Sequence, residues 1–90
     1  MTKGTFKITS ETGIHARPAT TLVNVAMAYD CEITLSAYKK TVDFKSIMGV
    51  MSLGIYSGTI IEVACVGEDE EKALKELSSK IIELNLGKEI

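Results

Sequence analysis

The sequence predicts an α+β fold, an open-faced β-sandwich of order βαββαβα in which three helices cover one face of a four-stranded antiparallel sheet. Ninety residues suffice for one modest core, so a single domain over residues 1–90 is expected. Four stretches alternate apolar and polar side chains, as strands with one buried face do. Two others repeat apolar side chains at steps of three and four, and one shorter stretch follows a capping residue, which indicates helices.

The first two elements differ in their apolar period. Residues 5–9 (TFKIT) alternate, which predicts a strand. Residues 16–27 instead predict a helix, because their apolar side chains recur at helical spacing at Ala19, Leu22, Val23 and Ala26. Pro18 fits only the first turn of a helix, where its missing N–H would have had no partner. The helix is therefore expected to begin almost at His15.

The next residues predict a β-hairpin and a short helix. Residues 31–38 and 41–44 both alternate, and a short turn near residues 38–40 joins them. Ser46 precedes residues 47–53 (IMGVMSL), a short helix or helical turn whose start its hydroxyl can cap. The side chains expected to face inward from the hairpin are Ile33, Leu35, Val42 and Phe44.

A fourth strand and a long helix complete the order. Residues 59–66 alternate, with Ile61, Val63 and Cys65 directed inward. Residues 68–84 begin with acidic side chains, which favour the positive end of a helix dipole. Their apolar side chains follow helical spacing at Ala73, Leu74, Leu77, Ile81 and Leu84.

Composition and charge limit the classes of function that the protein can have. A formal net charge of -2 and a pI of about 5.3 argue against binding to nucleic acid or anionic membranes, which needs clustered positive charge. No signal peptide or membrane span is recognisable, so a cytoplasmic protein without membrane insertion is expected. Cys31 and Cys65 are too few for a zinc site and are expected to be buried thiols rather than a disulfide or redox pair. Neither a metal nor a cofactor is expected.

The chain's only histidine, arginine and proline, His15, Arg17 and Pro18, fall within four consecutive positions. The unpaired N–H groups at a helix start favour an anion, and a guanidinium pairs with phosphate oxygens in a fork. Gly13 allows a close turn that exposes His15. The hydroxyl of Thr12 could cap the helix or donate a hydrogen bond to a phosphate. These features fit covalent phosphoryl transfer through His15. Anion binding without covalent chemistry, or a plain capping histidine, stays open.

Other catalytic constellations are missing from the sequence. There is no second histidine to support a triad, no GxSxG motif and no recognisable Cys-His pair, which argues against a hydrolase. The seven glycines are dispersed, and none forms a Walker-type or dinucleotide-binding loop. The protein is therefore not expected to bind ATP itself.

Two motifs about thirty residues apart, GIHARPAT (residues 13–20) and KSIMGVMSLG (residues 45–54), resemble the HPr family, and the resemblance extends over the whole chain. HPr proteins are histidine-containing phosphocarriers of the phosphoenolpyruvate-dependent sugar phosphotransferase system. The second motif resembles the version found in low-GC Gram-positive bacteria. The resemblance implies a carrier rather than an enzyme. It implies that Enzyme I phosphorylates His15 on Nδ1, and that His15 passes the phosphoryl group to the IIA domain of a sugar permease.

The resemblance also implies roles for other residues. Arg17 would stabilise the phosphoryl group in transit, and the amides of Ala16 and Arg17 would hold its oxygens. Ser46 would be phosphorylated by HPr kinase/phosphorylase, and the resulting form would act with the catabolite control protein CcpA in carbon catabolite repression. The residues expected to contact partners are Thr20, Ile47, Met48 and Met51.

The chain departs from the family pattern at two places. Asn24, Met27 and Ala28 lie late in the first helix, where relatives often carry basic or polar side chains, which predicts weaker electrostatic docking to Enzyme I. Asp43 replaces a common asparagine near Ser46, which predicts a less efficient kinase step. Two alternatives to the carrier remain: a Crh-like adaptor modified only on Ser46, although Crh lacks this histidine, and an anion-binding domain of ferredoxin-like topology.

Overall fold

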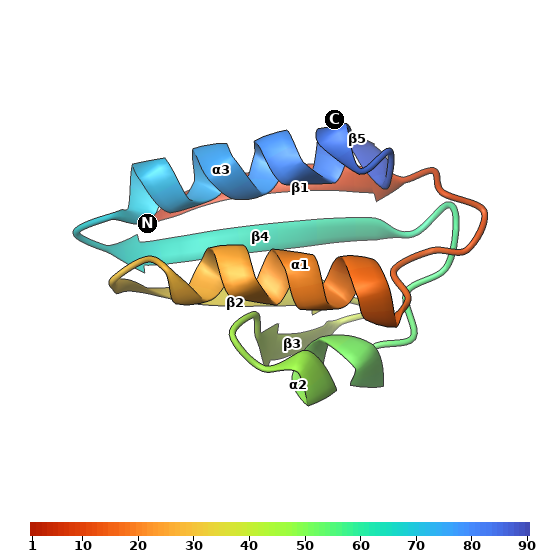
Figure 1. Cartoon of the computed structure of the whole chain (residues 1–90), viewed down its shortest axis with the longest axis horizontal. Helices are drawn as coiled ribbons and strands as arrows, with labels where there is room; N and C mark the ends of the chain where they lie inside the picture. The colour runs from red at the N-terminus through yellow and green to blue at the C-terminus, as the bar shows by residue number, and fades with distance from the viewer.

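The computed structural model describes all ninety residues, 1–90, as one α+β open-faced sandwich. Its three helices lie on one face of an antiparallel sheet (Figure 1), as the sequence predicts. The elements in chain order are β1 (Thr2–Ile8), α1 (Ala16–Met27), β2 (Cys31–Ala37), β3 (Lys40–Asp43), α2 (Ile47–Ser52), β4 (Ile60–Gly67), α3 (Glu70–Glu83) and β5 (Gly87–Glu89).

The sheet has five strands in the order β3-β2-β4-β1-β5, so the prediction of four was wrong by one. The additional strand β5 has only three residues and no apolar alternation, and it pairs with the edge of β1. Asn85, at a φ of 55°, reverses the chain after α3 and sends it back along β1. Gly87 fits there because a Cβ at this position would lie 2.3 Å from the carbonyl oxygen of Lys7. Backbone geometry, rather than side-chain pattern, therefore makes this strand.

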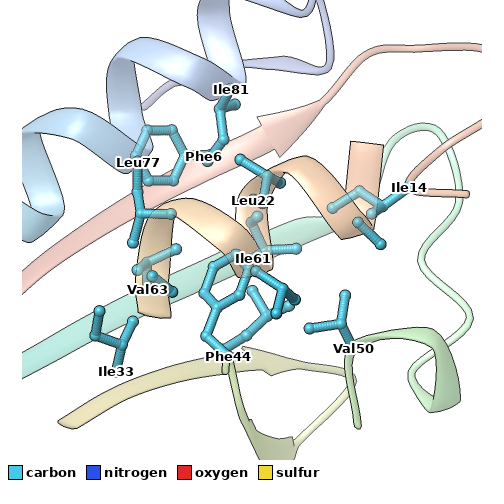
Figure 2. Close-up of a cluster of buried hydrophobic side chains, with 14 of the residues drawn as sticks. Phe6, Ile14, Leu22, Ile33, Phe44, Val50, Ile61, Val63, Leu77 and Ile81 are labelled. Atoms are coloured by element: carbon cyan, nitrogen blue, oxygen red, sulfur yellow. The ribbon is translucent and has the colours of Figure 1, made fainter. Parts of the chain in front are cut away.

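The core lies between the helices and the sheet (Figure 2). Twenty-two buried apolar side chains form one cluster, and no polar or charged residue is buried, so a single hydrophobic core stabilises the domain. Of the side chains predicted to face inward, most are buried, but Val42 and Leu74 are only half-buried. Leu84 was predicted wrongly, because α3 ends at Glu83 and leaves Leu84 38% exposed, while Leu86 enters the core beyond the turn.

Both cysteines are buried free thiols, as expected. Burial raises the pKa of Cys65 to about 11, because the interior disfavours the thiolate. Burial also raises the pKa of Cys31. Since the thiolate is the reactive form, neither side chain offers a nucleophile near neutral pH.

One carboxylate ties the start of β1 to the start of α3. Glu70 accepts hydrogen bonds from the hydroxyl of Thr2 and the amide of Gly67, and it lies 3.2 Å from the amino group of Met1. These contacts lower the pKa of Glu70 to about 2, because each of them favours the charged carboxylate. The predicted acidic start of this helix therefore also holds the start of β1.

Candidate functional site

The connection between β1 and α1 positions His15. Gly13 has a φ of +62°, and its N–H donates to the carbonyl of Ser10 at 3.0 Å, which closes a tight turn. The next residue, Ile14, is buried, and its N–H donates to the carbonyl of Ile55 at 3.2 Å. Figure 2 shows Ile14 at one end of the core, beside the start of α1. His15 follows this anchor at once and is held at the surface.

The start of α1 leaves backbone donors free. His15 is the N-cap, and its side chain makes no capping hydrogen bond. The first hydrogen bond of the helix runs from the N–H of Ala19 to the carbonyl of His15 at 3.0 Å, so the amides of Ala16 and Arg17 precede the bonded turn. Pro18 lies in the first turn as predicted, and no acidic side chain lies there to neutralise the helix dipole. A helix start with free amides and no acidic side chain favours a nearby anion.

An open pocket of about 370 Å³ brings His15 and Arg17 together. Arg17 is exposed and takes part in none of the three ion pairs of the chain, so its guanidinium is available to a ligand. Sequence reasoning missed most of the other lining residues, which come from the β1–α1 connection, α1 and the connection after α3. The pocket is lined by Ser10, His15, Arg17, Pro18, Thr21, Leu84 and Leu86.

The two threonines proposed from the sequence lie differently from each other. Thr12 does not line the pocket or cap α1, so its interpretation as a helix cap was wrong. Its hydroxyl lies 3.2 Å from that of Ser10, within the connection that precedes the helix start. Thr20 is exposed on α1, and its hydroxyl donates to the carbonyl of Ala16 at 2.8 Å.

The second predicted region, α2, packs against α1, and Ser46 is its N-cap residue. The hydroxyl of Ser46 accepts a hydrogen bond from the amide of Gly49 at 3.0 Å, which confirms the predicted helix cap. Val50 is the only buried residue of the helix. The three apolar side chains proposed as a partner surface are all exposed, by 42% at Ile47, 82% at Met48 and 40% at Met51.

The residues that depart from the family pattern are also on the surface. Asp43 accepts a hydrogen bond from the amide of Lys45 at 2.9 Å, and its own carbonyl accepts one from the amide of Ser46 at 3.1 Å. A carboxylate therefore lies in the turn that leads directly to Ser46. Asn24 and Met27 are exposed on α1, Ala28 is exposed at its C-cap, and none of the three adds charge there.

Two other kinds of site find no support in the ninety residues. No group of three or more histidine, cysteine, aspartate or glutamate side chains lies together as metal ligands would. None of the three helices combines the length and apolar character that crossing a bilayer requires.

The open-faced sandwich therefore presents one histidine and one arginine together at a free helix start. The family model described as the PTS HPr component phosphorylation site matches residues 2–83. The chain therefore belongs to the HPr family of the sugar phosphotransferase system, as its two motifs indicated.

Solved structures of similar proteins agree with this assignment. The histidine-containing phosphocarrier protein of a Mycoplasma is 35% identical, has a TM-score of 0.94, and matches over 96% of this chain and 98% of its own. The phosphocarrier protein HPr of Bacillus anthracis is 35% identical with a TM-score of 0.81, over 88% of this chain and 94% of that one. Crh of Bacillus subtilis, a catabolite repression protein, is 38% identical with a TM-score of 0.73, over 86% of this chain and 88% of that one.

Proposed function

We propose that His15 accepts a phosphoryl group from phosphorylated Enzyme I and passes it to the IIA domain of a sugar permease. The observation that carries this proposal is the exposed, uncapped imidazole of His15 beside Arg17 at the free start of α1. An open site suits a carrier, because two partners must reach the same nitrogen in turn. The pocket lies at the helix start and is open to solvent.

The transfer exchanges one bond to phosphorus for another. Nδ1 of His15 attacks phosphorus with its lone pair, which requires the ring proton on Nε2. The bond between phosphorus and the donor atom of Enzyme I breaks, and its electron pair returns to that atom. Delivery to the IIA domain repeats the exchange in the opposite sense at His15. No oxidant, reductant or cofactor enters either step.

The surroundings of His15 supply the charge that the transferring group needs. The phosphoryl oxygens carry negative charge throughout the transfer. Preorganised hydrogen-bond donors lower the barrier because they stabilise this charge in the transition state. Arg17 provides a fixed fork of N–H groups, and the amides of Ala16 and Arg17 point out of the helix start. Both donor sets come from consecutive residues of one helix turn.

The direct test is incubation with Enzyme I and labelled phosphoenolpyruvate. The protein should gain the mass of one phosphoryl group, in a bond that acid hydrolyses and alkali does not. An anion-binding domain without covalent chemistry would gain no mass under the same conditions. Absence of label would therefore overturn the carrier function.

Arg17→Ala is expected to slow phosphoryl transfer roughly 10- to 100-fold, because a hydrogen bond to a charged group contributes about 1.5 to 3 kcal/mol. The unfolding free energy should change by less than about 0.5 kcal/mol, since Arg17 is exposed and forms no ion pair. Rapid-quench transfer kinetics and urea unfolding measure the two effects.

Two variants control for the loss of positive charge. Arg17→Lys keeps the charge without the planar fork and should fall between wild type and Arg17→Ala. Lys75→Ala removes an exposed cation from α3 outside the His15 pocket and should leave transfer unchanged. A loss of several kcal/mol of stability in Arg17→Ala would instead make this arginine structural.

We further propose that Ser46 is the regulatory phosphorylation site for HPr kinase/phosphorylase and that its phosphorylated form binds CcpA. Exposed Ile47, Met48 and Met51 support a docking face beside Ser46, because flexible apolar side chains adapt to several partners. A phosphate on Ser46 would add negative charge at the edge of that face. It would repel an acidic partner and attract a basic one.

Ser46→Asp is expected to slow phosphoryl acceptance from Enzyme I by roughly tenfold, with the loss reduced at high salt. The fold should be unaffected, because aspartate is as good an N-cap as serine. Ser46→Asn keeps a capping side chain without charge and should behave as wild type. Transfer rates at two ionic strengths test this, and acceptance by Ser46→Asp at the wild-type rate would contradict the regulatory role.

A further inference from the structure

The turn between β2 and β3 contains a residue that the local backbone does not favour. Tyr38 and Lys39 connect paired Ala37 and Lys40, and they have φ values of 54° and 64°. A two-residue hairpin turn with both φ values positive strongly prefers asparagine, aspartate and glycine, because a Cβ is disfavoured in this region. The tyrosine is therefore not explained by the turn that it forms.

The phenol of Tyr38 joins this turn to the segment between α2 and β4, residues 54–59. Its oxygen lies 2.6 Å from the hydroxyl of Thr59 and 3.4 Å from the carbonyl of Gly54, and it accepts the amide of Tyr56 at 3.3 Å. One hydroxyl has one proton and two lone pairs, so donation to Gly54 and acceptance from the other two satisfies all three contacts. A single atom thus holds the beginning, middle and end of the 54–59 segment.

The 54–59 segment in turn supports the connection that presents His15. The carbonyl of Ile55 accepts the amide of Ile14, and a Cβ on Gly13 would lie 2.1 Å from that same oxygen. Figure 1 shows the two connections side by side at one end of the sheet. Ile55 lies between two residues bonded to Tyr38, so the backbone that meets Gly13 is fixed on both sides.

We propose that Tyr38 is a positioning residue for phosphoryl transfer, which holds the 54–59 segment so that Ile55 fixes the Gly13–Ile14 backbone ahead of His15. The proposal rests on the function proposed for His15. Reactive groups must meet at a defined distance and angle, and small displacements remote from the reacting atoms lower the rate. We call the three hydrogen bonds of the Tyr38 hydroxyl to the 54–59 segment the tether. Loss of the tether should reduce the rate of transfer more than the affinity for Enzyme I.

The test compares Tyr38→Phe with wild type as substrates of Enzyme I. The variant keeps the ring and the turn but loses the hydroxyl, and its kcat should fall by at least about threefold while KM changes less. Amide hydrogen exchange at Ile14, whose N–H is bonded to Ile55, should become faster in the same variant. Both measurements are made well below the melting temperature of each protein.

Two further variants separate positioning from general loss of stability. Thr59→Val removes the hydroxyl that is 2.6 Å from Tyr38 and should show the same two effects to a smaller extent, because the contacts with Gly54 and Tyr56 remain. The double variant should lose no more than Tyr38→Phe alone. Lys39→Gly relaxes the same turn without touching the tether and should leave kcat and Ile14 exchange unchanged.

The outcomes distinguish this proposal from the function on which it rests. Wild-type kcat and wild-type exchange at Ile14 in Tyr38→Phe would overturn the positioning role while the carrier function stands. If wild type accepts no phosphoryl group, the carrier function fails. Exchange at Ile14 then still decides whether Tyr38 holds this backbone. Equal losses in Lys39→Gly and Tyr38→Phe would also overturn the proposal, because the turn itself would then be responsible.

Discussion

Replacement of His15 by alanine is expected to abolish phosphoryl acceptance from Enzyme I and to leave the fold intact. His15 is the only histidine of the chain, and no other residue lining its pocket is a comparable nitrogen nucleophile. Its side chain is exposed and makes no capping bond, so the unfolding free energy should change by less than about 0.5 kcal/mol. Label from phosphoenolpyruvate and urea unfolding measure the two expectations.

His15→Asn provides the matched control for the helix start. Asparagine is among the best N-cap residues, so this variant keeps or improves the start of α1 while removing the nucleophile. Both variants should take up no acid-labile label, which assigns the loss to chemistry rather than to the helix. Label that persists in either variant would contradict the carrier function. Growth of a His15→Ala strain on a phosphotransferase sugar would instead support a Crh-like adaptor that acts through Ser46.

The part of the site that the sequence predicted is local in the chain. His15, Arg17 and the amides of Ala16 and Arg17 belong to one helix start, and Pro18 places that start by ordinary backbone rules. The cap at Ser46 was predictable for the same reason, because a serine ahead of a short apolar run needs only its own helix. No information about tertiary packing was required for either region.

The part that was missed depends on contacts between distant segments. Thr21 is one helical turn beyond Arg17, and this spacing was a usable signal for a pocket residue. Leu84 and Leu86 offered no such signal, because they lie on the two sides of the reversal at Asn85. That reversal also creates β5, whose pairing depends on where α3 ends against β1. The periodicity of apolar residues predicts which face of a helix or strand is buried. It does not predict which other segment the end of a helix contacts.

Gly13→Ala is expected to be the most destabilising single-methyl substitution in the site, at about 2 to 5 kcal/mol. An alanine at a φ of +62° costs about 1 to 2 kcal/mol. Its Cβ would also lie 2.1 Å from the carbonyl oxygen of Ile55, and backbone cannot yield as a flexible side chain does. If Gly13 and Ile55 move apart to relieve this contact, the amide of Ile14 loses its hydrogen bond to Ile55, which adds about 1 to 3 kcal/mol to the loss of stability. Urea unfolding measures the sum.

Gly54→Ala is the control that separates the cost of the Cβ contact with Ile55 from the cost of a positive φ. Gly54 has nearly the same φ, +58°, but a Cβ there meets nothing within 4 Å, so only the conformational cost of about 1 to 2 kcal/mol should appear. The difference between the two variants isolates the approach of Gly13 to Ile55. Equal losses would show that the connection moves freely away from Ile55, and His15 would then owe its place to the helix start alone. A larger loss for Gly13→Ala, together with slower transfer in the fully folded variant, would make this backbone contact part of what holds the nucleophile.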